Sequence, residues 1–118
     1  MTSTTITVRV RSVGFHRWPD APDEVRFLAS PHRHVFGFAV TLAVTGHDRE
    51  LEFFLVQARM RDAISSIGTA SPMGLDFGAQ SCEHIACALC QALLSQDLPV
   101  VSVEVDEDGE NSACVRTL

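Results

Sequence analysis

The feature that most constrains this chain is a run of alternating apolar residues between positions 32 and 44. Its large side chains fall on even positions, and the odd positions between them hold mostly arginine, threonine or small residues. Alternation with a period of two predicts a β-strand with one buried face. The even set also includes two histidines at the start of the run: His32, His34, Phe36, Phe38, Val40, Leu42 and Val44.

His32 and His34 therefore project from one face of the predicted strand. At about 3.3 Å rise per residue their backbone positions lie about 7 Å apart, which suits two ligands of one metal ion. An earlier run, Thr5–Val13, predicts a neighbouring strand; if that strand continues without a bulge, His16 falls on its inward face. His16, His32 and His34 would then offer three ligands and leave a fourth coordination position open, as in catalytic zinc sites. The simpler alternative for an H-x-H pair is two solvated or locally hydrogen-bonded histidines.

The composition is that of a globular protein without a polyanionic partner. The chain has 118 residues, of which 46% are hydrophobic, and this predicts a single domain over residues 1–118. The net charge of −6 argues against nucleic acid or an anionic membrane as the main partner. No apolar run reaches about 18 residues, and Met1–Thr5 resembles no signal peptide. We therefore expect a cytoplasmic protein.

The cysteines do not form a recognisable motif. Cys82, Cys87 and Cys90 crowd into nine residues of an apparent helix, and no secretory signal points to an oxidising compartment. Cys87 and Cys90 have C-x-x-C spacing, but no second pair follows and no thioredoxin-like unit surrounds them. We therefore predict buried structural thiols.

Alternation, helical periodicity and turn residues together predict the order β-β-α-α-β-β. In chain order we expect a strand at Thr5–Val13, a turn-rich loop at Trp18–Asp23, the strand from His32, a helix with an apolar stripe from Phe53 to Ile67, a loop at Thr69–Gly78, a helix with a stripe from Cys82 to Leu93, and strands at Val101–Val105 and Ser112–Thr117. The fold class is α+β, with one four-stranded antiparallel sheet and both helices on one face. Its exposed edge strands favour closure into a barrel by oligomerisation.

Five short motifs, in their order along the chain, resemble those of the tunnelling-fold family of pterin synthases, 6-pyruvoyl- and 6-carboxytetrahydropterin synthase. The motifs are Gly14–Trp18 for A-A-H-R-L, His32–His34 for H-G-H, Leu51–Phe53 for I-D-F, Ser81–Glu83 for P-T-S-E and Val103–Glu107 for V-x-V-x-E. The resemblance covers nearly the whole chain and implies a ββααββ tunnelling fold. It also implies zinc as cofactor on the three histidines, a small heterocyclic ligand, and a homo-oligomer, a trimer or hexamer, with sites at subunit boundaries.

The chain differs from that family at the positions of the residues that transfer protons. The family's catalytic cysteine stands four residues before the first histidine of H-G-H, and this chain has Leu28 there. The L-D-H motif that activates the cysteine is replaced by Leu75, Asp76 and Phe77. Asp76 and His84 are the remaining candidates for an acid–base role, although a histidine on the first turn of a helix is more often a surface residue. The metal and heterocycle anchors are thus expected to persist without the usual catalytic groups.

Glu107 keeps the inward parity of the strand that begins at Val101. Burying an unpaired carboxylate is costly, and the N–C–N edge of a pterin or purine offers two parallel donors that match its two acceptors. The resemblance implies the same role, as the anchor of the heterocycle. The alternative is that Glu107 begins the acidic turn 106–110 and is solvated.

Three functional hypotheses follow. The first is a zinc-binding protein that binds a pterin, purine or deazapurine-type ligand and lacks the usual catalytic cysteine and histidine. The second is an active lyase of a pterin or deazapurine (queuosine-precursor) pathway with a non-standard acid or base. The third is a metal-free structural module, in which the histidine pattern is a coincidence.

Overall fold

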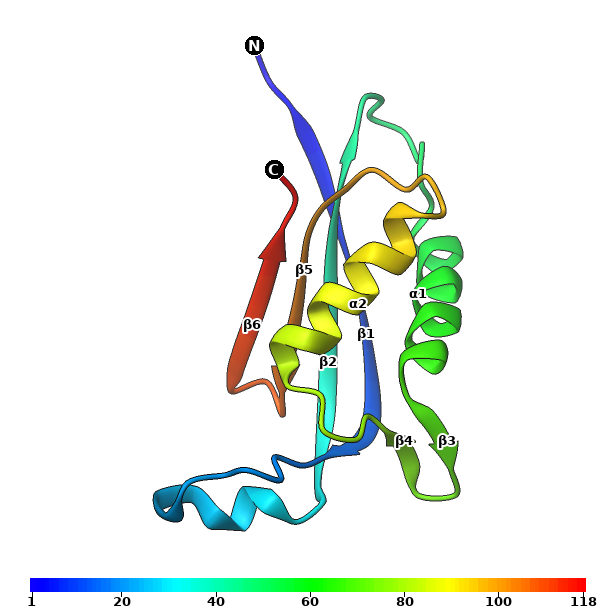
Figure 1. Cartoon of the computed structure of the whole chain (residues 1–118). Helices are drawn as coiled ribbons and strands as arrows, with labels where there is room; N and C mark the ends of the chain where they lie inside the picture. The colour runs from blue at the N-terminus through cyan, green and yellow to red at the C-terminus, as the bar shows by residue number, and fades with distance from the viewer.

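The computed structural model describes all residues, 1–118, as one sheet with two α-helices on one side (Figure 1). In chain order the elements are β1 (Thr4–His16), the 3₁₀ helix η1 (Asp23–Ala29), β2 (His32–Val44), α1 (Phe53–Ile67), β3 (Thr69–Ser71), β4 (Gly74–Asp76), α2 (Cys82–Leu94), β5 (Val100–Glu107) and β6 (Asn111–Arg116). The predicted α+β class is confirmed. Neither α-helix is long and apolar enough to cross a membrane.

The sheet has six strands in the order β3-β4-β1-β2-β5-β6. Four of its pairings are antiparallel, and β1 pairs with β4 in parallel. The predicted four-stranded antiparallel sheet is therefore wrong, because the segment Thr69–Gly78, expected to be a loop, contains the β3–β4 hairpin. Each of these strands has only three residues, too few for alternation to be visible in the sequence, and Gly74 turns the chain with φ +132°.

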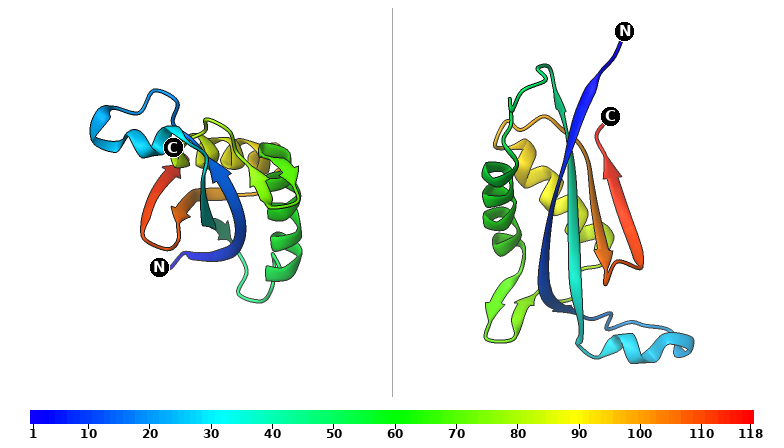
Figure 2. Two further views of the ribbon diagram at one scale, coloured as in Figure 1. Left: turned by 90° about the horizontal axis from the view of Figure 1, so that it is seen from below. Right: turned by 180° about the vertical axis from the view of Figure 1, so that it is seen from behind.

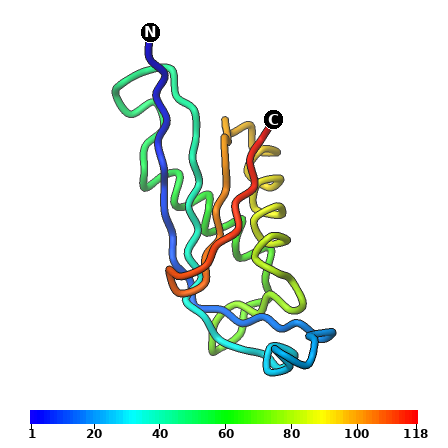
Figure 3. Tube along the Cα trace, turned by 90° about the vertical axis from the view of Figure 1, so that its left-hand side faces the viewer, coloured from blue at the N-terminus to red at the C-terminus, as the bar shows by residue number.

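Helices α1 and α2 lie on the same side of the sheet (Figures 1 and 2). A third helix, η1, was not predicted, and it projects from the end of the sheet opposite the two chain termini (Figure 3). It buries none of its residues and contains Val25 in a non-helical conformation. Because η1 has no buried face, it has no apolar periodicity by which it could be predicted.

The core lies between the sheet and the two α-helices. It contains the even-numbered apolar side chains of β1 and β2, the inner stripes of the helices, and Val100, Val103 and Val105 of β5. Phe36, Val40 and Leu42 are fully buried, as the alternation predicts. Cys90 is buried and Cys82 is half-buried, but Cys87 and Cys114 are exposed, and all four thiols are free. The predicted burial of Cys87 is wrong because that residue lies off the inward stripe of α2.

The β1–β2 ladder runs without a bulge from Thr4 opposite Val44 to His16 opposite His32. This continuity is the condition under which His16 was expected to share the face of His32 and His34, and it is confirmed. Inward parity is thus kept over the whole length of both strands.

Gly14 is the inward residue that precedes His16 on β1, and it lies opposite His34. A β-carbon at this position would lie 2.8 Å from Phe77 Cε2 and 2.9 Å from the carbonyl oxygen of Leu75 in β4. The absence of a side chain therefore lets β4 and the Phe77 ring close against β1 below the histidines.

We predict that Gly14→Ala lowers the free energy of unfolding by about 1–3 kcal/mol, since the new methyl group overpacks the core against backbone that cannot move freely. The measurement is urea denaturation of the metal-free protein. Gly46→Ala is the control, because a β-carbon there meets only Glu50 Oε1, at 3.4 Å. Equal stability of the two variants would contradict this account of Gly14.

Candidate metal centre

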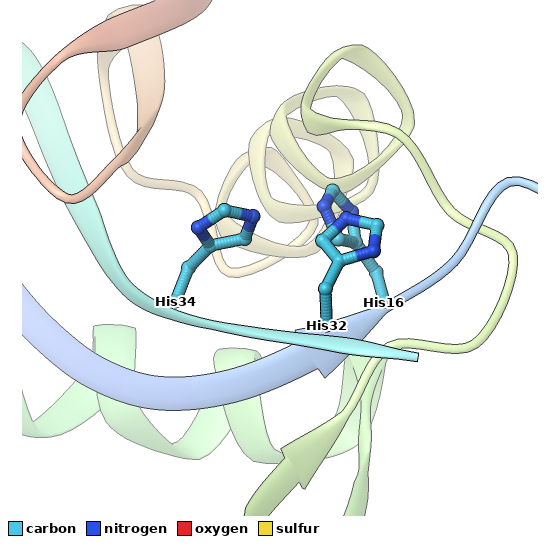
Figure 4. A group of neighbouring side chains, drawn as sticks. All are labelled: His16, His32 and His34. Atoms are coloured by element: carbon cyan, nitrogen blue, oxygen red, sulfur yellow. The ribbon is translucent and has the colours of Figure 1, made fainter. Parts of the chain in front are cut away.

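Three histidines converge at the end of the β1–β2 ladder (Figure 4). His16 and His32 are paired across the two strands, and His34 follows on the same face of β2. One ring nitrogen from each of the three lies within 4.8 Å of the others. His16 is buried, with 8% of its surface exposed, and the other two are half-buried. The structure therefore brings together the three residues that the sequence predicts as metal ligands.

The Nδ1 atom of each histidine has an acceptor outside the cluster. His16 Nδ1 lies 2.9 Å from the carbonyl oxygen of Gln80, and His32 Nδ1 lies 2.9 Å from that of Ser30. His34 Nδ1 lies 2.7 Å from Asp108 Oδ2. Because a carbonyl oxygen only accepts, the nitrogen facing it carries the proton in a neutral ring, and the Nε2 lone pair is left free. Metal-ligating histidines are oriented in the same way.

Two of the freed nitrogens have no hydrogen-bond partner. His16 Nε2 and His34 Nε2 are buried, and neither forms a hydrogen bond. A buried polar atom without a partner is costly and unusual in a folded protein. A divalent cation between three imidazoles would satisfy both atoms, so the residues present fit a zinc ion.

The protein surroundings favour neutral imidazole at His16. Burial lowers the pKa of His16 below 6.5, and this outweighs the opposite effects of Gln80 and Glu107. The Phe36 ring packs beneath the cluster, 5.2 Å from His16 and 5.5 Å from His34 between ring centroids, and Phe77 packs behind Phe36 at 5.1 Å. This aromatic floor keeps the inner side of the cluster apolar.

Glu107, at the end of β5, faces the cluster as its parity predicts. Its Oε2 atom lies 2.9 Å from His16 Nε2 and 3.7 Å from His34 Nε2. The Cys82 thiol, at the first residue of α2, donates a long hydrogen bond of 3.7 Å to the same oxygen. Burial, together with the nearby Glu107 carboxylate, raises the pKa of Cys82 to about 12. This thiol is therefore a hydrogen-bond donor at neutral pH and not a thiolate.

A cavity of about 810 Å³ opens beside the cluster. His16, His32 and Glu107 lie on its inner wall, and residues from the loop after β1, the start of α2 and the start of β6 complete it. Among these are Leu28, Cys82 and His84. The cavity therefore joins the histidine cluster to a space large enough for a small organic ligand.

The two acid–base candidates lie in different surroundings. His84 lines the cavity but is exposed, at the first turn of α2. Asp76 is not among the lining residues, and its carboxylate accepts a hydrogen bond from the backbone N–H of Gly78 at 2.8 Å. Phe77, at the position of the family's histidine, is buried in the core. The structure thus places His84 on the wall of the same cavity as His16 and His32, and gives Asp76 a local role in a turn.

Sequence reasoning missed the residues that orient the histidines. Asp108 was read only as part of a turn, yet its carboxylate accepts from both His34 Nδ1 and the backbone N–H of Val35. The hydrogen bond from His34 is the main reason that the pKa of Asp108 is lowered. The β2–β5 register, with Phe36 opposite Glu107, carries Asp108 to this place. Aligning the inward residues of the two strands could have found it.

Comparisons with known proteins establish the fold. No protein-family model and no curated protein matches this chain. Among solved structures, an uncharacterized protein, WS1659, from Wolinella succinogenes is similar over 100% of both chains, with a TM-score of 0.72 and 15% identity. The 6-pyruvoyl tetrahydropterin synthase of Caenorhabditis elegans is similar over 100% of this chain and 98% of its own, with a TM-score of 0.65 and 14% identity. The predicted resemblance to the tunnelling-fold pterin synthases is confirmed at the level of the fold.

We predict that the metal-free protein becomes less stable as the pH falls below about 6.5. Because the pKa of His16 is lowered in the native state, the unfolded chain binds a proton there that the native chain does not bind until a lower pH. The free energy of unfolding, measured in chelator between about pH 7.5 and pH 5, should therefore decrease on acidification. His16→Asn, whose amide can still donate to Gln80, should have a flatter profile; identical profiles would contradict the assignment.

Proposed function

We propose that this chain is a zinc-binding protein that holds a pterin, purine or deazapurine-type heterocycle and lacks the usual proton-transfer groups of the pterin synthases. One observation carries the proposal. One ring nitrogen from each of three imidazoles lies within 4.8 Å of the others, the Nε2 atoms of His16 and His34 are buried without a hydrogen-bond partner, and His16 and His32 line a cavity. His16, His32 and His34 would hold the metal, which supplies a Lewis acid that polarises a hydroxyl or carbonyl group.

The heterocycle would lie in the cavity beside the histidines. A volume of about 810 Å³ is within the usual range for small-molecule sites. Glu107 lies on the cavity wall with 29% of its side chain exposed, and no arginine forms an ion pair with it. Its carboxylate can therefore accept two parallel hydrogen bonds from the N–C–N edge of a ring.

The chain's own residues provide little for moving protons at the ligand's side chain. Leu28 lines the cavity where the family's cysteine stands, and Phe77 is in the core where its histidine stands. The Cys82 thiol and the His84 ring are two groups at the cavity wall that can carry a proton. Their presence at the cavity keeps a second candidate function open, that of an active lyase of a pterin or deazapurine pathway with a non-standard acid or base.

The proposal includes assembly of several copies. β6 is an edge strand, and β1 pairs with β4 only at Gly14 and Phe15, so most of one side of β1 has no strand neighbour. Unpaired edges favour addition of another strand. A homo-oligomer, trimer or hexamer, that closes these edges into a barrel would place the cavities near subunit boundaries. The cytoplasmic location expected from the sequence stays a prediction.

We predict about one zinc ion per chain in protein reconstituted at neutral pH, because one ring nitrogen from each of three histidines is available at a single point. His32→Ala and His34→Ala should abolish binding, and acidification should release the metal since ligating imidazoles must be unprotonated. Asp108→Asn should weaken zinc affinity about 10–100-fold by releasing the His34 ring. Elemental analysis and chelator competition measure these effects.

Glu110→Gln is the control for Asp108→Asn, since it removes the same charge from an exposed residue of the same hairpin. Its zinc affinity should equal that of the wild type. Reconstituted wild-type protein without metal would refute the zinc site.

We further predict binding of dihydroneopterin triphosphate with negligible turnover. General acid–base groups contribute about 10²–10⁴-fold each, and both of the usual ones are missing. At saturating zinc, Glu107→Gln should weaken binding, because an amide replaces one of two acceptors by a donor. Calorimetry measures binding and chromatography of products measures turnover. Robust turnover by the wild type would favour the lyase instead, and unchanged binding by Glu107→Gln would remove Glu107 from the ligand site.

A further inference from the structure

We propose that Glu107 is the fourth metal ligand of this centre while the cavity contains no heterocycle. The inference rests on the zinc site of the proposed function and changes that site from one with an open position to one with four protein ligands. The three histidines alone leave one position open, whereas three histidines and a carboxylate form a closed four-coordinate site. The inference is supported by the distances from the Glu107 carboxylate to the histidines, by its charge and by its hydrogen bonds.

Two of the distances from Glu107 to the histidines suit a tetrahedral site. With metal–ligand bonds of about 2.0–2.1 Å, two ligand atoms of a tetrahedral zinc site lie about 3.3 Å apart. Glu107 Oε2 lies 2.9 Å from His16 Nε2 and 3.7 Å from His34 Nε2, on either side of that value. A carboxylate oxygen at these two distances is close to a ligand position, and a shift of Glu107 toward His32, which lies beyond ion-pair distance, would complete it.

The charges at this point favour a cation. The Nδ1 atom of His16 faces the carbonyl oxygen of Gln80, so a neutral ring turns its Nε2 lone pair toward the Glu107 carboxylate. Despite the 2.9 Å approach, His16 Nε2 has no hydrogen-bond partner. Two electron-rich atoms so close repel each other, and no arginine lies within ion-pair distance of Glu107 to offset the repulsion. A divalent cation between them removes it.

Other residues also fix the position of the Glu107 carboxylate. The Cys82 thiol donates to Glu107 Oε2, the oxygen nearest the histidines. Glu107 is paired with Phe36 in the β2–β5 ladder, and the next residue, Asp108, binds His34 Nδ1. Two consecutive residues of one strand end therefore act on the same centre, one toward the metal position and the other through a histidine.

Because Glu107 would bind both the metal and the heterocycle, the two would compete for its carboxylate. A ring whose N–C–N edge takes both oxygens of Glu107 would draw the carboxylate away from the metal. The fourth position would then open only when the ligand is bound. Glu107 would thus connect ligand binding to the reactivity of the metal.

The experiment compares wild type with Glu107→Gln and with Glu104→Gln, which removes the same charge from an exposed residue on the opposite face of β5. Zinc affinity is measured by chelator competition. Each protein is also loaded with cobalt(II), whose visible spectrum reports its ligands, and titrated with sodium azide, which binds only at an open or water-occupied position. No catalytic assay is involved.

We expect Glu107→Gln to bind zinc at least about 10-fold more weakly than wild type, and its cobalt spectrum to respond to azide at a concentration at least about 10-fold lower. Glu104→Gln should match the wild type in both. If wild type and Glu107→Gln have the same zinc affinity and the same azide response, Glu107 is not a ligand, although the zinc site stands. If the wild type binds neither metal, the proposed function itself fails, and the two failures are therefore distinguishable.

Discussion

The unbroken β1–β2 ladder is the constraint on which the rest of the structure depends. Side chains alternate between the faces of a strand, so one inserted residue would send every later side chain to the opposite face. Thirteen consecutive pairs keep register from Thr4 to His16, and the same inward face carries first the core and then the histidines. The apolar contacts that stabilise the fold thereby also place His16 opposite His32.

The histidines of the candidate site are oriented by residues that lie outside β1 and β2. His16 is held through Gln80 in the loop before α2, and His34 is held through Asp108 at the end of β5. Each acceptor binds one ring nitrogen and directs the other toward the centre of the cluster. The three rings are therefore oriented although they form no hydrogen bonds with one another. The aromatic floor of Phe36 and Phe77 leaves the cavity side as the open direction.

Sequence reasoning succeeded where periodicity is long and failed where elements are short or structure is set by distant contacts. The alternating strands, the two α-helices, the histidine face and the direction of Glu107 all follow from period and parity. The β3–β4 hairpin has strands of three residues, and η1 has no buried face, so neither leaves a pattern. Asp108 and Gln80 were missed because their role depends on strand register and loop path. The exposure of Cys87 already follows from the inward stripe of α2, which does not include that residue.

The hydrogen bond between His34 and Asp108 joins residues 74 positions apart in the chain. Contacts of such long sequence separation form only after a large loop has closed, and closing it costs chain entropy before any interaction repays it. The cluster is therefore expected to assemble late, after β2 and β5 have paired. An ion bound there would act mainly on the native side of the folding barrier, so it would slow unfolding while leaving the rate of folding nearly unchanged. In this fold, a metal centre would lengthen the lifetime of the native state more than it would accelerate folding.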